Sequence, residues 1–104
     1  MAYRVVWSEA ALSRAAEFLD FIARDNPAAA RRVIRDLFDR VAALADQPRM
    51  GRRLSATAET DLRRLVAGKY IVVYQIHEPR KTITVVAARH SRERLLSEEE
   101  SPTP

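Results

Sequence analysis

The last apolar run of the chain, VVAA at residues 85–88, is followed at once by Arg89, His90 and Arg92. The unperturbed pKa of histidine lies near neutral pH, so this side chain can give or take a proton there. Guanidinium groups hold phosphate and carboxylate oxygens through paired hydrogen bonds. Cleavage of RNA through the 2′-hydroxyl needs a base, an acid and cations for the phosphate charge, and His90 with its arginine neighbours is chemically sufficient for it. The same residues also suit docking onto an acidic partner.

Two pairs of adjacent arginines occur earlier in the chain, Arg52-Arg53 and Arg63-Arg64. Neighbouring side chains of a strand point to opposite faces, so we expect at least two of these cations to be merely solvated. The others are expected to join one basic surface that holds phosphates or carboxylates. The full candidate set for binding a partner or nucleic acid is Arg52, Arg53, Arg63, Arg64, Arg89, Arg92 and Arg94.

Composition narrows the class of protein. The chain has 104 residues, of which 47% are hydrophobic, and this suits one domain with a substantial core. It has no cysteine and only two histidines, so we expect no disulfide, no metal site and no cofactor. No segment approaches the roughly 20 apolar residues that span a bilayer, and the N-terminus does not resemble a secretory signal. We therefore expect a soluble, cytoplasmic protein that does not contact a membrane.

The net charge is +4, and sixteen of the eighteen cationic residues are arginines, since only Lys69 and Lys81 are lysines. A GC-rich genome would produce this bias without any functional cause. Recognition of nucleic acid or of an acidic protein segment would also favour arginine, because its planar fork binds oxyanions bidentately. Both explanations stay open.

The N-terminal half predicts a strand and two helices. Residues 3–7 are short and β-branched, which is typical of a strand. Ser8 follows at the position of a helix N-cap, and apolar residues then recur at three- and four-residue steps as far as Ala23. Asn26-Pro27 ends this helix and begins a second one, which ends before Gln47-Pro48. Because almost no loop separates the two helices, we predict an antiparallel helical hairpin.

The C-terminal half predicts a sheet. Residues 48–61 contain proline, glycine and polar residues and predict a linker. Three apolar segments follow, joined by short connections that favour antiparallel pairing: residues 62–66, 70–76 and 82–88. The order β-α-α-β-β-β predicts an α+β fold with the helical hairpin packed on one face of an antiparallel sheet. Residues 1–96 are assigned to this single domain, and residues 97–104 are expected to be an acidic, disordered tail.

Three segments together resemble the RelE/ParE superfamily of toxins from type II toxin–antitoxin systems. They are GRRL at residues 51–54, LRRLVAGKYIVVYQI at residues 62–76 and VVAARHSRE at residues 85–93. The likeness extends from residue 3 to about residue 95 and includes the expected order of elements. It implies a growth-inhibiting toxin, associated with plasmid stabilization, that is held silent in a hetero-oligomer with a cognate antitoxin.

The superfamily uses two mechanisms, and the fold does not choose between them. RelE-like members are endonucleases that cut mRNA on the ribosome. ParE-like members inhibit DNA gyrase and need no hydrolytic site of their own. The chain is therefore an enzyme only under the first hypothesis, where His90, Arg92 and Arg64 would be its catalytic residues.

Departures from the RNA-cutting pattern favour the ParE-like hypothesis. Relatives that cut RNA commonly have an arginine just after the strand tyrosine, whereas Ile71 follows Tyr70 here. Several also have a tyrosine in the C-terminal segment, and none follows Arg92 in this chain. Arg92 and Arg64 do match cationic positions of such relatives. We therefore favour gyrase inhibition without a catalytic residue, keep the mRNA endonuclease as the alternative, and place a basic nucleic-acid-binding module third.

Overall fold

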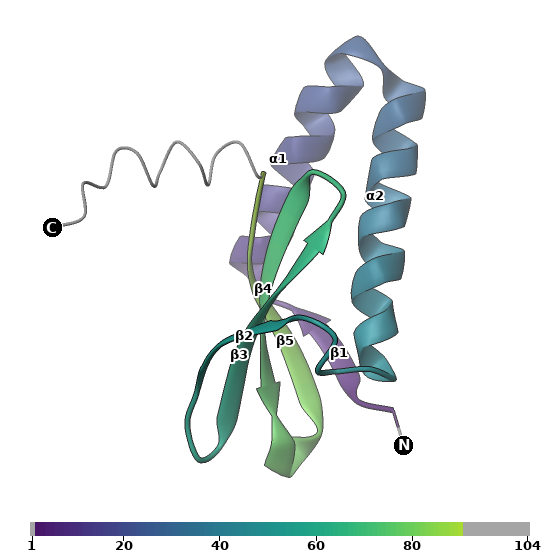
Figure 1. The fold of residues 1–104 in the computed structure, drawn as a ribbon. Helices are drawn as coiled ribbons and strands as arrows, with labels where there is room; N and C mark the ends of the chain where they lie inside the picture. Colours follow the sequence, from purple (N-terminus) through teal and green to yellow (C-terminus); the bar gives the residue numbers. More distant parts are fainter. Residues whose placement is uncertain (1, 91–104) are drawn as a thin grey trace, which may run out of the picture.

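The protein is described from a computed structural model over residues 2–90 (Figure 1). Seven helices and strands and two short 3-10 turns follow one another along the chain. They are β1 (Arg4–Trp7), α1 (Glu9–Asp25), α2 (Pro27–Ala42), η1 (Ala43–Ala45), β2 (Arg52–Ala56), β3 (Thr60–Ala67), β4 (Tyr70–His77), η2 (Glu78–Arg80) and β5 (Thr82–His90). The predicted domain end at residue 96 and the predicted tail at residues 97–104 lie outside the described residues.

The molecule has two layers, a helical hairpin and a five-stranded sheet (Figure 1). The strand order is β1-β5-β4-β3-β2, and α1 contacts β5 while α2 contacts β3. The predicted α+β fold with a helical hairpin on one face of the sheet is confirmed. The sheet is mixed, however, because β1 pairs with β5 in parallel and the other strands pair antiparallel. A parallel pair requires a long connection, and here the chain between β1 and β5 contains both helices and the other three strands.

The predicted linker at residues 48–61 is wrong in part, because β2 and the start of β3 lie within it. The sheet therefore gains a fifth strand at its edge. All five side chains of β2 are exposed, so the segment lacks the apolar alternation that identifies a strand from sequence. Its pairing with β3 also shifts register between Arg53 and Ser55. Strand formation here depends on a neighbour along the sheet, and local pattern does not reveal it.

The helix boundaries follow from local chemistry. The Ser8 side chain accepts a hydrogen bond from the Ala11 amide at 3.0 Å, and the Asn26 side chain accepts one from the Ala29 amide at 3.0 Å. Each cap satisfies a backbone donor that the first helical turn leaves free. Pro27 occupies the first turn of α2, where its missing N–H costs nothing. The predicted hairpin is confirmed, and none of the described helices is long and apolar enough to cross a membrane.

The core lies between the two layers. Its largest fully buried side chains are Tyr74, Leu44, Ile76, Ile83, Val41, Val72 and Val85. Along β4 the residues Tyr70, Val72, Tyr74 and Ile76 belong to this core, so the even-numbered positions of β4 face the helices. The odd-numbered positions consequently face the other side of the sheet, which no described helix covers. We call this side the open face.

Candidate functional site

The register of the sheet separates the two adjacent arginine pairs. Arg64 pairs with Val73 of β4 and with Arg52 of β2, so both arginines stand on the open face. Arg63 pairs with Tyr74 and with Arg53, so these two arginines lie on the helix-facing side. The expectation that adjacent arginines divide between two faces is therefore confirmed, and a single basic face containing all of them is not formed.

Arg89 joins Arg52 and Arg64 on the open face. It pairs with Ile71, which lies two positions before Val73 and so points to the same side of β4. Within the described residues, no carboxylate lies within ion-pair distance of Arg52, Arg64 or Arg89. We call these three residues the open-face arginines. Arg92 and Arg94, the other members of the candidate set, lie outside the described residues.

Arg53 and Arg63 are instead engaged by a carboxylate, so the expectation that the arginines outside the basic surface are merely solvated is wrong. Asp61 has 6% of its surface exposed and accepts hydrogen bonds from Arg53 at 3.1 and 3.2 Å and from Arg63 at 3.1 Å. Arg49 approaches the same carboxylate at 4.0 Å. Burial alone would raise the pKa of Asp61, but the hydrogen bonds from the two arginines outweigh it and lower this pKa. Arg53 and Arg63 on the helix-facing side are thus engaged within the fold, whereas the open-face arginines form no ion pair with a described residue.

The buried Tyr74 holds the segment from Pro48 to Gly51, which leads into β2. The Tyr74 hydroxyl accepts a hydrogen bond from the Gly51 amide at 2.9 Å and donates one to the Pro48 carbonyl at 2.8 Å. A Cβ at Gly51 would lie 2.4 Å from the Arg64 carbonyl oxygen, so only glycine fits at this approach. The Arg63 guanidinium also donates to the Arg49 and Gly51 carbonyls, at 3.1 and 2.8 Å. The chain that enters β2 is therefore held firmly against the sheet.

His90 lies on the helix-facing side. It pairs with Tyr70, and its ring meets the Tyr70 ring edge-to-face with 5.1 Å between centroids. The Tyr70 ring in turn packs against Phe18 of α1, with 4.9 Å between centroids. His90 and Arg64 thus stand on opposite faces of the sheet and are not brought together. Among the described residues, no group of three His, Asp or Glu side chains is placed to hold a metal ion.

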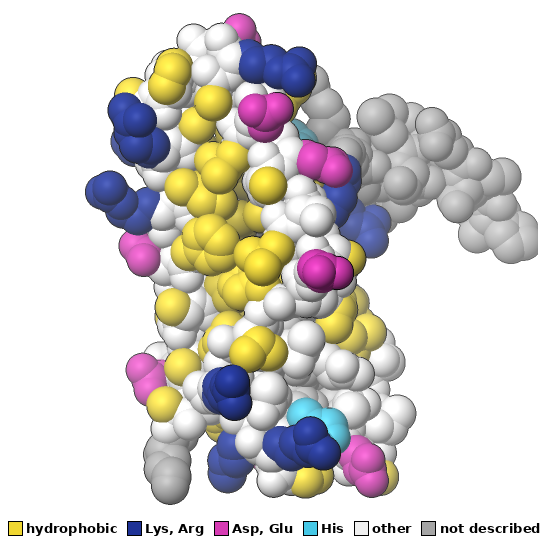
Figure 2. All heavy atoms as spheres, turned by 180° about the vertical axis from the view of Figure 1, so that it is seen from behind, with side chains coloured by type: hydrophobic (Ala, Val, Ile, Leu, Met, Phe, Trp, Pro, Cys, Tyr) yellow, Lys and Arg dark blue, Asp and Glu magenta, His cyan; other side chains and the backbone are white. Residues whose placement is uncertain are grey.

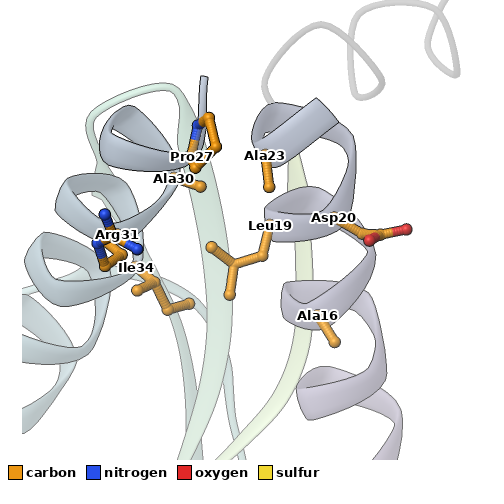
Figure 3. A pocket seen from close by; sticks show the side chains of 8 residues that line it. All are labelled: Ala16, Leu19, Asp20, Ala23, Pro27, Ala30, Arg31 and Ile34. Carbon is orange, nitrogen blue, oxygen red and sulfur yellow. The ribbon is translucent and has the colours of Figure 1, made fainter. Parts of the chain in front are cut away.

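A second surface, which the sequence did not reveal, lies on the outer side of the helical hairpin. An open hollow of about 370 Å³ separates α1 from α2 there (Figure 3), and its lining is mostly apolar. Leu19 of α1 and Ile34 of α2 point into it, with Asp20 and Arg31 at its two sides (Figure 3). The full lining is Ala16, Leu19, Asp20, Ala23, Pro27, Ala30, Arg31 and Ile34.

Exposed apolar side chains are also found beside this hollow on the same two helices. Leu12 of α1 is 45% exposed and Phe38 of α2 is 36% exposed. Phe38 packs edge-on against Trp7, with 4.7 Å between ring centroids. Figure 2 shows apolar side chains gathered in the middle of this side of the molecule. We call the hollow together with Leu12 and Phe38 the outer helix surface. The sequence does contain a pattern that indicates this surface. The four-residue steps from Leu12 to Ala16 and from Leu19 to Ala23 form a second apolar stripe beside the core stripe of α1.

Comparison with known proteins gives a consistent result. Residues 5–95 match the family described as ParE toxin of type II toxin–antitoxin system, parDE. The "Putative toxin Y4kP" of Sinorhizobium fredii is 34% identical over 95 residues, which cover 89% of this chain and 96% of that protein.

Solved structures agree in fold. A chain of the chromosomal ParDE system from P. aeruginosa has a TM-score of 0.69 at 15% identity, covering 86% of this chain and 96% of its own. A chain of the archaeal RelE–RelB complex from Pyrococcus horikoshii OT3 has a TM-score of 0.60 at 22% identity, with coverages of 88% and 97%. The isolated E. coli RelE toxin has a TM-score of 0.57 at 20% identity, with coverages of 95% and 96%. These likenesses extend to both branches of the superfamily.

Proposed function

We propose that this protein, which belongs to the family of ParE toxins of type II toxin–antitoxin systems, arrests growth by binding and inhibiting DNA gyrase. It needs no hydrolytic site of its own for this activity. A cognate antitoxin neutralises it by forming a hetero-oligomer. Family membership supports the toxin activity and the antitoxin partner, and the geometry of the sheet supports inhibition by contact.

The proposal rests on the charge of the open face, which presents cations and no carboxylate among the described residues. Asp61 is the single acidic residue within the five described strands, and it points to the helix-facing side. The open-face arginines stand on three neighbouring or near-neighbouring strands and are free of ion pairs within the described residues. Arg4 adds a fourth cation, because it pairs with Thr82 on the open side of β5. A surface of one charge sign attracts a partner of the opposite sign and fixes its orientation.

The placement of His90 supports contact over catalysis. General acid–base chemistry on a phosphate requires the proton-transfer group and the phosphate-binding cation to reach the same atoms. Arg64 lies on the open face and His90 on the helix-facing side, where its ring contacts Tyr70. The hypothesis of an mRNA endonuclease that uses both residues gains no geometric support from the described residues.

The outer helix surface suits the antitoxin. Exposed apolar area on a helix pair is a typical docking site for the apolar face of an amphipathic helix or extended segment. Arg31 at one side of the hollow can pair with a carboxylate of the incoming segment, whereas Asp20 at the other side already forms an ion pair with Arg24 at 3.7 Å. An antitoxin bound on this surface would leave the open-face arginines to the target, unless a second part of it crosses to the sheet.

A supercoiling assay tests the proposal directly. Purified toxin is titrated into gyrase, ATP and relaxed plasmid, and both supercoiled and linear DNA are measured. We expect loss of supercoiling at toxin concentrations that also arrest growth in cells, and addition of antitoxin should restore it. Undisturbed gyrase together with growth arrest would refute the proposal, and mRNA cleavage in a translation extract would then identify the alternative. Normal growth at high expression, with binding to duplex DNA, would indicate the third hypothesis, a nucleic-acid-binding module.

A further inference from the structure

The side chains of β2, the strand that carries Arg52, do little to fix its register with β3. β2 is an edge strand of five residues, all with exposed side chains, and its pairing with β3 shifts at the bulge between Arg53 and Ser55. Register is weakly specified in strands without a buried face, and a slip of one residue moves every side chain to the opposite face. A slip in either direction would remove Arg52 from its place opposite Arg64.

The buried carboxylate of Asp61 lies next to the Arg53–Arg63 pair, at the point where the pairing of β2 with β3 shifts. Asp61 is on the helix-facing side of β3, two positions from Arg63, and Arg53 stands opposite Arg63 across the strands. Like charges directly opposite each other in a sheet repel, and the Asp61 carboxylate offsets this by bonding both guanidinium groups at 3.1–3.2 Å.

Each slipped register loses one of two contacts that the observed register makes, the Arg53 bond to Asp61 or the Gly51 bond to Tyr74. If β2 moved by one residue in one direction, Leu54 would stand opposite Arg63 and the apolar side chain would replace the Arg53 contact with Asp61. If it moved in the other direction, Arg52 would replace Arg53 opposite Arg63, so Asp61 would keep an arginine partner. Gly51 would then stand opposite Arg64, and its hydrogen bond to Tyr74 would break. The observed register keeps both contacts. The Tyr74 contact anchors the entry to the strand, and Asp61 acts on the strand itself, next to the bulge that would absorb a slip.

We propose that Asp61 is a positioning residue, which locks the register of β2 and thereby holds Arg52 beside Arg64 on the open face. Asp61 does not touch the target, because it lies on the opposite side of the sheet. The part of the proposal that concerns target binding rests on the proposed function, since it assumes that Arg52 and Arg64 contact gyrase. The part that concerns register does not depend on the proposed function, since it stands on the contacts of Asp61 and on the Tyr74 contact with Gly51.

The variant Asp61→Asn tests the lock, because it keeps the shape of the side chain and removes its charge. We expect loss of the cross-strand backbone NOEs between Arg52 and Arg64 and between Ser55 and Leu62, while NOEs between β3 and β4 persist. Asp36→Asn is the matched control, since Asp36 makes only a surface ion pair with Arg40 on α2, and its NOEs should all be retained. Retention of the β2–β3 NOEs in Asp61→Asn would overturn the proposal.

Inhibition of gyrase supplies a readout that a merely stabilising role would not move. Asp61→Asn should raise the half-inhibitory toxin concentration about 10-fold in the native background. It should have almost no further effect in an Arg52→Ala background, and its full effect in an Arg89→Ala background. An equal loss in all three backgrounds would mean that Asp61 acts through general stability, and the positioning role would be overturned.

A substitute variant and the Arg52→Ala variant separate failure of the register proposal from failure of the proposed function. If Asp61→Asn does not fold, Arg53→Met replaces it, because the Arg53 side chain is 55% exposed and its loss removes only one side of the lock. The same loss of β2–β3 NOEs is expected, and their retention would again overturn the proposal. If Arg52→Ala alone leaves gyrase inhibition unchanged, the proposed target contact is wrong, and the NOEs still decide whether Asp61 locks the strand.

Discussion

The open face of the sheet and the outer helix surface are opposite in position and in chemistry. Within residues 2–90 the open face carries arginines without a compensating carboxylate, among mostly apolar and hydroxyl side chains. The outer helix surface is apolar, with Asp20 and Arg31 at the sides of its hollow. In a two-layer fold, each layer has one side that faces away from the core. In this protein that side is charged on the sheet and apolar on the helical hairpin. The difference suggests two partners of different chemistry, so variants on one surface should leave the activity of the other intact.

The largest effect is expected from the double variant Arg52→Ala/Arg64→Ala. Each guanidinium can make charge-assisted hydrogen bonds worth about 1.5–3 kcal/mol, so losing both should raise the half-inhibitory concentration against gyrase by roughly 100-fold or more. Titration in the supercoiling assay measures this, and antitoxin affinity should change little. The matched control is Arg24→Ala/Arg40→Ala, which removes the same charge from helix-surface ion pairs. An equal loss in the control would mean that net charge, and not the open face, governs inhibition.

The next effect concerns the outer helix surface. Truncating a central aromatic contact commonly costs about 2 kcal/mol of binding free energy, so Phe38→Ala should weaken antitoxin binding about 30-fold. Gyrase inhibition by the free toxin should be unchanged. Calorimetric titration with the antitoxin measures the affinity, and thermal unfolding checks that loss of the Trp7 contact has not unfolded the chain.

Phe21→Ala is the control for that variant. Phe21 is 73% exposed and lies on α1 outside the lining of the hollow, so its loss removes the same atoms without touching the proposed contact. Equal weakening by Phe21→Ala and Phe38→Ala would place the antitoxin elsewhere on the helices. Loss of gyrase inhibition by Phe38→Ala would break the division between the two surfaces.

The sequence predicted the helix starts and the strand alternation, which depend on neighbouring residues in the chain. It did not predict the features that depend on contacts between residues of different strands. Ser8 and Asn26 marked the helix starts because a cap acts within three residues. Alternation predicted that Arg63 and Arg64 would separate, since it is a property of any strand. β2 was missed because none of its side chains is buried, so it lacks the apolar alternation of a strand. The assignment of Arg52 to the open face likewise required its pairing with Arg64, which the local sequence does not define.

A moderate effect on stability is expected for Tyr74→Phe. The hydroxyl has two backbone partners, the Gly51 amide and the Pro48 carbonyl, and its removal leaves both in a buried place. An unsatisfied buried group costs about 1–3 kcal/mol, so the free energy of unfolding should fall by that amount in urea titration. Tyr70→Phe is the control, because the Tyr70 hydroxyl makes no hydrogen bond within the described residues. Equal losses of unfolding free energy in both variants would mean that the hydrogen bonds of the Tyr74 hydroxyl to Gly51 and Pro48 do not stabilise the fold.

A smaller effect should appear in the pH dependence of stability. The folded-state pKa of Asp61 is lowered, so its contribution is fully present above the ordinary aspartate range near pH 4 and is lost as the pH falls through the lower folded-state pKa. The difference in unfolding free energy between the native chain and Asp61→Asn should therefore shrink on acidification below about pH 4. We expect a difference of about 1–2 kcal/mol at neutral pH, because Asp61 and Arg63 are largely buried whereas Arg53 is largely exposed and its contribution is screened. A difference that is independent of pH would mean that the carboxylate charge does not hold β2.

The smallest effect is expected for His90→Ala, and it tests the assignment of function most directly. His90 packs on Tyr70 at the helix-facing side, away from the open-face arginines, so gyrase inhibition should change by no more than about 2-fold. Arg64→Ala measured in parallel separates the two mechanisms. Contact with gyrase predicts loss of activity in Arg64→Ala alone, whereas an endonuclease that uses both residues predicts loss in each. If His90→Ala abolishes growth arrest while thermal unfolding is unchanged, the division between the faces does not describe function.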